Sequence, residues 1–219
     1  MKQQTAKPGT PQTRGEHGNN FPPIIFIACL FFMFLPAFKI FSQTRALNYE
    51  ILRNGNKVGK LHFAQSSIDG MNYMKIESDV KTRFVFTFTA MSKEEAFYYN
   101  GILVRSSIFR QMNGKEKANK QHQAVNKQYI ISTGKNYAVA RNYPITYNML
   151  SLYSMEPGNI SQVYSDNFET FIAIEKAGDH KYKITLPDGN YNYYYYGDGI
   201  LKTVEIHHSL YSASIVLVQ

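Results

Sequence analysis

The segment GILKTVEIHHSL, residues 199–210, carries an acid and an imidazole that could act together. Glu205 and His207 are two residues apart, and alternate residues of a strand point to the same face. Such a pair could transfer a proton or supply two ligands to a metal ion. His208 would point to the opposite face, so the two histidines cannot chelate one metal. A polar contact on the strand surface is the simpler interpretation, because no ligand spacing such as His-Glu-x-x-His supports a metal site.

Motifs for nucleophilic and nucleotide chemistry do not occur in the sequence. There is no Gly-x-Ser-x-Gly elbow and no phosphate-binding Gly-x-x-x-x-Gly-Lys, and no helix pattern follows Gly197-Asp198-Gly199. The carboxylates of a glycosidase need not be close in the chain, and the acidic doublet Glu94-Glu95 is better explained as solvated charge. We therefore predict no catalytic residue, no metal and no cofactor. The protein is expected not to be an enzyme, with a glycan-acting hydrolase as the alternative.

The run YNYYYYGDGIL, residues 191–201, is rich in tyrosine. In a strand, Tyr193 and Tyr195 would share one face and Tyr194 and Tyr196 the other. Because tyrosine combines a large ring with a polar hydroxyl, such a face could bind a sugar or an apolar ligand, or form the margin of a core. Tyr98 holds the matching place in the similar segment FYYNGILVRSS. The candidate ligand-binding residues are Tyr193, Tyr195, Tyr98, Glu205 and His207.

Residues 105–141 contain eight basic side chains and one acid, Glu116. A surface of this kind could attract anionic lipid, polysaccharide or nucleic acid, or it could be a solvated hairpin face. The solvated face is the simpler interpretation. For an exported protein we expect no nucleic acid, and an anionic envelope surface is the candidate partner of this segment. The candidate basic patch consists of Arg105, Arg110, Lys115, Lys117 and Lys120.

The N-terminal part has the pattern of an export signal. Residues 1–20 are polar and basic, residues 24–38 are apolar apart from Pro36, and polar residues follow. About 20 apolar residues are needed to span a bilayer, so we predict a signal cleaved near Ser42 or Gln43. The protein would then lie in the periplasm or cell envelope. The alternative is an uncleaved inner-membrane anchor formed by residues 24–38.

Removal of residues 1–43 would also change the composition. The remaining residues 44–219 hold 20 Lys and Arg against 15 Asp and Glu, a net charge of +5. Cys29, the only cysteine, would be lost with the signal, which leaves no disulfide and no thiol nucleophile. We predict one domain over residues 44–219.

Turn and strand signals predict the fold of that domain. Asn-Gly and Asp-Gly pairs, which suit tight hairpin turns, separate short runs rich in Tyr, Phe, Ile, Val and Thr. The alternating run TRFVFTFTA, residues 82–90, reads as one strand. Ile145, Met149 and Leu152 follow a helical period, so a short helix is expected at about 145–155. We predict a mainly β fold of about ten strands, a strongly curved antiparallel sheet or partly open barrel with that helix on its concave side or at a mouth.

The segments NYEILRNGNKVGKLHF, YYNGILVRSS and YYYYGDGILKTVEIHHSLYSASIVL resemble a functionally uncharacterised family of exported, β-rich proteins common in Bacteroidota. The resemblance covers residues 45–219 and implies no catalytic residue. At fold level, the predicted sheet and helix are similar to the half-barrels of periplasmic lipoprotein carriers and lipid-binding proteins. Fold-level similarity does not determine function, and our leading hypothesis is an exported envelope protein that binds an apolar or lipid-like ligand without catalysis. A purely structural envelope protein stays an alternative beside the hydrolase.

Overall fold

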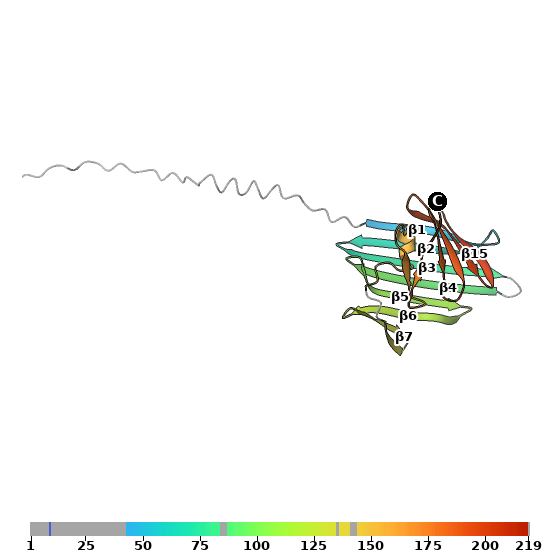
Figure 1. The fold of residues 1–219 in the computed structure, drawn as a ribbon, viewed down its shortest axis with the longest axis horizontal. Coiled ribbons are helices and arrows are strands. Elements are labelled where there is room, and N and C mark those ends of the chain that lie inside the picture. The colour runs from blue at the N-terminus through green and yellow to red at the C-terminus, as the bar shows by residue number, and fades with distance from the viewer. Residues whose placement is uncertain (1–8, 10–42, 84–86, 135, 141–143, 219) are drawn as a thin grey trace, which may run out of the picture. The chain divides into compact units, whose positions relative to one another are not determined.

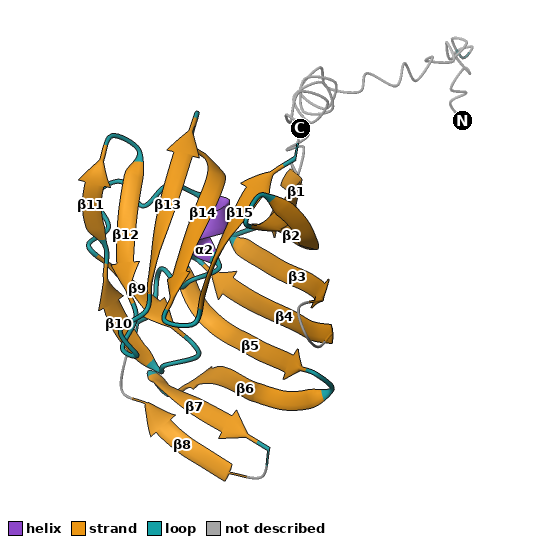
Figure 2. Ribbon diagram, turned by 90° about the vertical axis from the view of Figure 1, so that its right-hand side faces the viewer, coloured by secondary structure: helices purple, strands orange, loops and turns teal. Residues whose placement is uncertain are grey.

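Within the described residues, thirteen strands form one antiparallel sheet, in the order β11-β12-β13-β14-β15-β1-β2-β3-β4-β5-β6-β7-β8. The computed structural model describes residues 9, 43–83, 87–134, 136–140 and 144–218, and the residues of the sheet belong to a compact unit spanning residues 40–219. The sheet curls without closing into a barrel, and the half containing β11–β15 faces the half containing β3–β7 (Figure 2). The predicted mainly β fold with one short helix is confirmed.

The first half of the sheet consists of β1 (Gln43–Arg53), β2 (Asn56–Ile68), β3 (Met71–Arg83), β4 (Thr87–Tyr99), β5 (Ile102–Met112), β6 (Lys115–Val125), β7 (Gln128–Thr133) and β8 (Asn136–Ala140) (Figure 1). The second half consists of β11 (Glu175–Gly178), β12 (Lys181–Thr185), β13 (Tyr191–Gly197), β14 (Ile200–His208) and β15 (Tyr211–Leu217). Between them in the chain lie α2 (Ser151–Ser154), β9 (Gln162–Ser165) and β10 (Thr170–Ala173). None of the helices in the described part of the chain is long and apolar enough to cross a membrane.

Two-residue turns with positive φ angles connect many of the neighbouring strands. Asn54-Gly55, Asp69-Gly70, Asn100-Gly101, Asn113-Gly114 and Asp198-Gly199 all place both residues in the left-handed region. That conformation matches the twist of a hairpin and favours Asn, Asp and Gly. Asp198-Gly199 forms such a turn between β13 and β14, as expected for an Asp-Gly pair that no helix follows.

Three local predictions differ from the structure. Residues 82–90 are not one strand, because Arg83 ends β3 and pairs with Thr87 at the start of β4. Strand β6 was missed because most of its residues are polar and exposed. Its turn to β7 at Asn126-Lys127 was also missed, because a lysine rather than a glycine has the positive φ.

The predicted helix at about 145–155 is only one turn long, at residues 151–154. The residues before it are extended, since Ile145 and Tyr147 are buried at alternate positions and Asn148 forms a bridge with Tyr164. The carbonyl of Ile145 also accepts a hydrogen bond from the Leu103 N–H at 2.8 Å. Tertiary contacts with β5 and β9 therefore outweigh the helical period of this segment.

Residues 144–174, here named the plug, fill the concave side of the sheet. They include α2 and the β9–β10 hairpin, and Figure 2 shows α2 between the two halves of the sheet. Ile145, Leu152 and Val163 of the plug share one buried core with Phe63 and Ile184 of the sheet. The apolar face of the curled sheet is thus covered by a segment of the same chain.

Tyrosine hydroxyls of the sheet bind the plug backbone. The Tyr196 hydroxyl donates to the Leu152 carbonyl at 2.9 Å, and the Tyr98 hydroxyl accepts from the Asn148 N–H at 3.1 Å. The Tyr129 hydroxyl donates to the Leu103 carbonyl of β5 and accepts from the Ile145 N–H of the plug at 3.5 Å. The bonds from the three tyrosines to the plug satisfy buried backbone groups of the plug, which would otherwise destabilise the fold.

Candidate functional site

A groove of about 890 Å³ lies on the outer face of the sheet, across β1–β5. Its outward side chains come from two adjacent cross-strand rows. One row runs Asn48, His62, Glu77, Lys93 and Phe109. The second row runs Glu50, Lys60, Asp79 and Met91. This surface, with Lys57 at one side, is named the outer groove.

Acids and bases alternate along both rows of the outer groove. Glu77 lies between His62 and Lys93, and Lys60 lies between Glu50 and Asp79. Opposite charges on neighbouring strands attract one another, so the polar part of the groove favours neither a cation nor an anion. The apolar side chains lie at the other end, where Met91 and Phe109 come from β4 and β5. The groove therefore offers an apolar end and a polar, charge-balanced end, which suits an amphiphilic molecule.

The predicted tyrosine site lies on another part of the outer face, on β13 and β14. Tyr193 and Tyr195 point outward and Tyr194 and Tyr196 inward, as the strand pattern predicted. Lys181 Nζ lies 4.3 Å from the Tyr193 ring centroid and 4.8 Å from that of Tyr195. The amine covers both rings from one side, so a sugar would have to displace it to stack there.

Glu205 and His207 lie beside these tyrosines. The Glu205 carboxylate accepts a hydrogen bond from the Tyr195 hydroxyl at 2.7 Å, and its Oε2 lies 3.8 Å from His207 Nε2. The His207 ring stacks on Tyr191, with centroids 4.6 Å apart. Among the described residues, no three His, Cys, Asp or Glu side chains gather as metal ligands.

Tyr98, the fifth predicted ligand residue, is far from the surface. It is 5% exposed, and its hydroxyl contacts the Ser151 hydroxyl of α2 at 3.1 Å. The structure therefore places Tyr98 under the plug and the other four candidates on the outer face.

The five residues of the predicted basic patch are divided between the two faces of β5 and β6. Arg105 points outward and lies over the Phe97 ring, and Lys115 and Lys117 are exposed. Arg110 points inward and pairs with Glu94 at 2.6 Å. Lys120 also points inward, where its amine bonds the Asn167 carbonyl and the Glu169 carboxylate of the plug. Two of the five charges are thus neutralised inside the curl of the sheet.

A buried polar cluster, absent from the sequence predictions, joins the plug to β5 and β6. Asp166 is 2% exposed, and its two oxygens accept hydrogen bonds from the Ser106 hydroxyl and the Asn148 amide. His122 is fully buried, with Nδ1 3.7 Å from the same carboxylate. Although serine, histidine and aspartate meet here, the carboxylate binds the serine rather than the imidazole. That geometry does not activate a nucleophile.

Burial shifts the acidities of the two ionisable groups in opposite directions. It raises the pKa of Asp166 to about 6, against the hydrogen bonds from Ser106 and Asn148, which lower it. It lowers the pKa of His122 to about 4. Each group therefore resists its charged form, as expected where water is excluded.

The chain has similarities at the level of family and of fold. Residues 49–218 match the family described as "Domain of unknown function (DUF6134)". Among solved structures, the chain is similar to a β-barrel-like protein of domain of unknown function DUF1849 from Brucella abortus. The TM-score is 0.52 and the identity 8%, over 82% of this chain and 98% of the other, so the likeness concerns the fold alone. No curated protein matches the sequence. The expected membership of a functionally uncharacterised, β-rich family is confirmed. The export of its members, their occurrence in Bacteroidota and the similarity to lipid carriers stay predictions.

The Asp166 cluster gives a testable pH dependence. The raised pKa of Asp166 means that its contribution to stability is complete below about pH 4 and is lost as the pH rises through about 6. Asp166→Asn can keep the hydrogen bond from Ser106, and because its side chain does not ionise, the variant does not lose stability as the pH rises. Relative to wild type, the free energy of unfolding of Asp166→Asn should therefore rise by about 3 kcal/mol between pH 4 and pH 7. Urea denaturation at both pH values measures this difference.

His122→Leu is the control with the opposite sign. Because the pKa of His122 is lowered, the wild type gains stability as the pH rises from 4 to 6.5, and this gain disappears in the variant. If the difference between Asp166→Asn and wild type does not change with pH, Asp166 is not a buried carboxylate with a raised pKa.

Proposed function

We propose that this chain, which belongs to the DUF6134 family of domains of unknown function, is a non-enzymatic binding module for an apolar or lipid-like ligand. The observation that carries the proposal is the outer groove, with its volume of about 890 Å³ and its apolar end at Met91 and Phe109. A groove of this size suits a small amphiphile. The apolar part of the ligand would lie on Met91 and Phe109, and its polar part beside the charges of β1–β3.

The packing of the interior supports a ligand site outside rather than inside the curl of the sheet. In a lipid carrier, the ligand would occupy the concave side. Here Tyr153 of the plug takes that place, since its ring packs edge-on against Tyr49 and stacks on Phe63, with centroids 5.6 and 6.0 Å apart. The outer groove needs no rearrangement of the plug to receive a ligand.

The positions of the carboxylates favour binding over glycan hydrolysis. A glycosidase needs two carboxyl groups on either side of an accessible bond. Asp166 is covered by the plug, and Glu94 forms an ion pair with Arg110 on the inner face. In the outer groove, Glu50 and Glu77 form ion pairs with Lys57 and Lys75 at 2.6 and 2.7 Å. A purely structural envelope protein is the remaining alternative. Such a protein would show no saturable ligand binding in the experiment below.

Ligand binding can be tested with a dansyl-labelled undecanoic acid and the variant Met91→Lys. Met91 is 42% exposed in the groove, and a lysine there would place a charge where the acyl chain is expected. Loss of one methionine contact of about 1.5 kcal/mol should weaken binding roughly tenfold. Fluorescence titration measures the dissociation constant.

Met112→Lys is the matched control, because Met112 is 38% exposed but does not line the groove. It pairs with Ala90, whose side chain points to the face opposite that of Met91. Its affinity should stay within about twofold of wild type. Equal losses in both variants would contradict the groove as the site. Absence of saturable binding to the wild type would support a purely structural role.

We also propose that the protein is exported to the periplasm or cell envelope. The pattern of residues 1–43 supports this, although residues 10–42 lie outside the described part of the chain. Strand β1 begins at Gln43, so cleavage near Ser42 or Gln43 would leave the whole sheet intact. N-terminal sequencing of protein from the periplasm of expressing cells should read a start near these residues. Protein that still begins at Met1 would contradict cleavage.

A further inference from the structure

Exposed apolar side chains gather at one end of the sheet, around the β2–β3 and β4–β5 turns. Ile68 pairs with Met71, and Met71 pairs with Tyr99 across the next ladder. Phe97 stands on the same face one row away, and Val104 follows on β5. Met71 is 54% and Tyr99 53% exposed, which is high for side chains of this size. These five residues are named the tip patch.

The two turns that carry the tip patch are fixed to each other. The N–H of Asn100 donates to the carbonyl of Gly70 at 2.8 Å. A side chain at Gly70 would collide with the Asn100 side chain, so the turns are in close contact. The patch is therefore a preformed surface whose binding would require little ordering of the chain.

Strand β1 begins at this end of the sheet, and the apolar run precedes it in the sequence. Gln43, the first residue of β1, pairs with Ser67, which precedes Ile68. Only residues 39–42 separate β1 from the apolar run 24–38. Four extended residues span at most about 14 Å. A chain whose residues 24–38 enter a bilayer would therefore have the start of β1 within that distance of the lipid.

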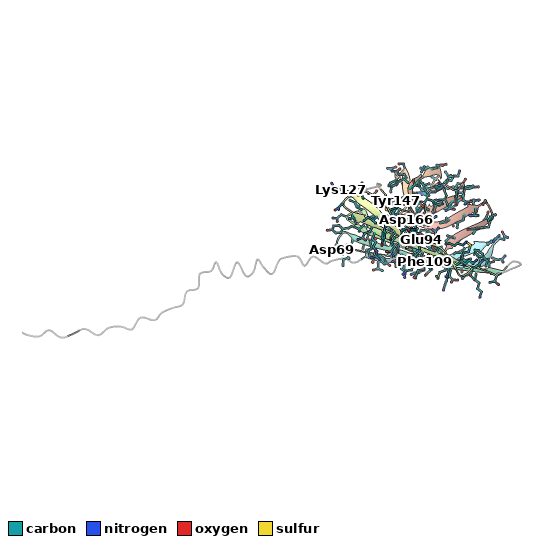
Figure 3. The ribbon with its side chains drawn as sticks, turned by 90° about the horizontal axis from the view of Figure 1, so that it is seen from below. Asp69, Glu94, Phe109, Lys127, Tyr147 and Asp166 are labelled. Atoms are coloured by element: carbon teal, nitrogen blue, oxygen red, sulfur yellow. The ribbon has the colours of Figure 1, made fainter. Side chains whose placement is uncertain are left out.

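The charges around the tip patch suit an anionic lipid surface. Arg105 lies over the Phe97 ring at 5.7 Å. Lys127, in the β6–β7 turn, lies at the same end of the sheet as Asp69 (Figure 3). Arg105 and Lys127 thus lie at the same end of the sheet as the exposed rings, and basic residues beside tyrosine and phenylalanine are typical of surfaces that lie in a membrane interface.

We propose that the tip patch lies on the surface of the lipid bilayer as long as the chain carries residues 24–38, that is, in the precursor before cleavage near Ser42 or Gln43, or in a chain that keeps these residues as an anchor. Ile68, Met71 and Tyr99 enter the interfacial layer, and Arg105 and Lys127 face the lipid headgroups. The outer groove stays accessible, because Met91 and Phe109 lie farther along β4 and β5 from these turns. The tip patch sets the orientation of the domain on the membrane. This orientation does not depend on the ligand groove.

The test compares two methionine positions in the full chain reconstituted into vesicles. Cys29→Ser removes the native thiol, and a single cysteine is then introduced as Met71→Cys or Met112→Cys and labelled with bimane. Met112 is the matched control because it is 38% exposed and ends β5 at the opposite end of the sheet. The vesicles contain phosphatidylcholine and phosphatidylglycerol, with or without bromine on the acyl chains.

The label at residue 71 should lose about half of its fluorescence in brominated vesicles, because interfacial apolar side chains reach roughly 5–10 Å into the lipid. The label at residue 112 should keep its intensity. Equal quenching of both labels, or no quenching at residue 71, overturns the proposal. A label at residue 71 that is shielded from aqueous iodide but not quenched by bromine would show contact with a second copy of the chain, which also overturns it.

Discussion

A curled antiparallel sheet has an apolar concave face that must be buried. In this domain residues 144–174 bury it, and the rest of the structure depends on that requirement. Thirteen strands are too many for a flat sheet, and a sheet that curls without closing must bury its inner face in another way. The plug does so with apolar side chains such as Leu152 and Val163. Its irregular backbone then needs hydrogen-bond partners inside the molecule, which Tyr98 and Tyr196 provide.

The same constraint explains why tyrosine is abundant and why polar groups are buried. An inward tyrosine of the sheet adds apolar area and, at its tip, a hydroxyl that reaches the plug. The carboxylate of Asp166 serves the plug in the same way, because it binds Ser106 of β5 and Asn148 of the plug. Removal of either partner would leave a buried charge without one of its two side-chain hydrogen bonds, which is far more destabilising than the loss of a surface contact. These groups are therefore explained by the filling of the sheet, and the exposed surfaces remain for binding.

Much of the fold could be predicted from local chemistry, but the candidate site could not. The Asp69-Gly70 turn fixes the register of β2 and β3, and so places His62 opposite Glu77. The next ladder cannot be predicted in this way, because residues 82–90 alternate like a strand although the chain reverses within them. A bulge at Ile51 and Leu52 shifts the ladder between β1 and β2. The groove rows cross all these ladders, so an error in one register conceals the site. The alternation at Tyr193–Tyr196 needed no register, and it was predicted correctly.

Native-state hydrogen exchange of the plug tests most directly whether this segment is a fixed part of the core. The Tyr164 N–H binds the Tyr147 carbonyl at 2.9 Å inside the plug, while Phe63 lies at the buried centre of β2. If the plug is part of the core, both amides exchange only on global unfolding, with the same opening free energy and the same dependence on denaturant. The contradictory result is exchange of the Tyr164 amide at a free energy several kcal/mol lower and independent of denaturant. The plug would then open by itself, and the concave side of the sheet, rather than the outer groove, would be the place for a ligand.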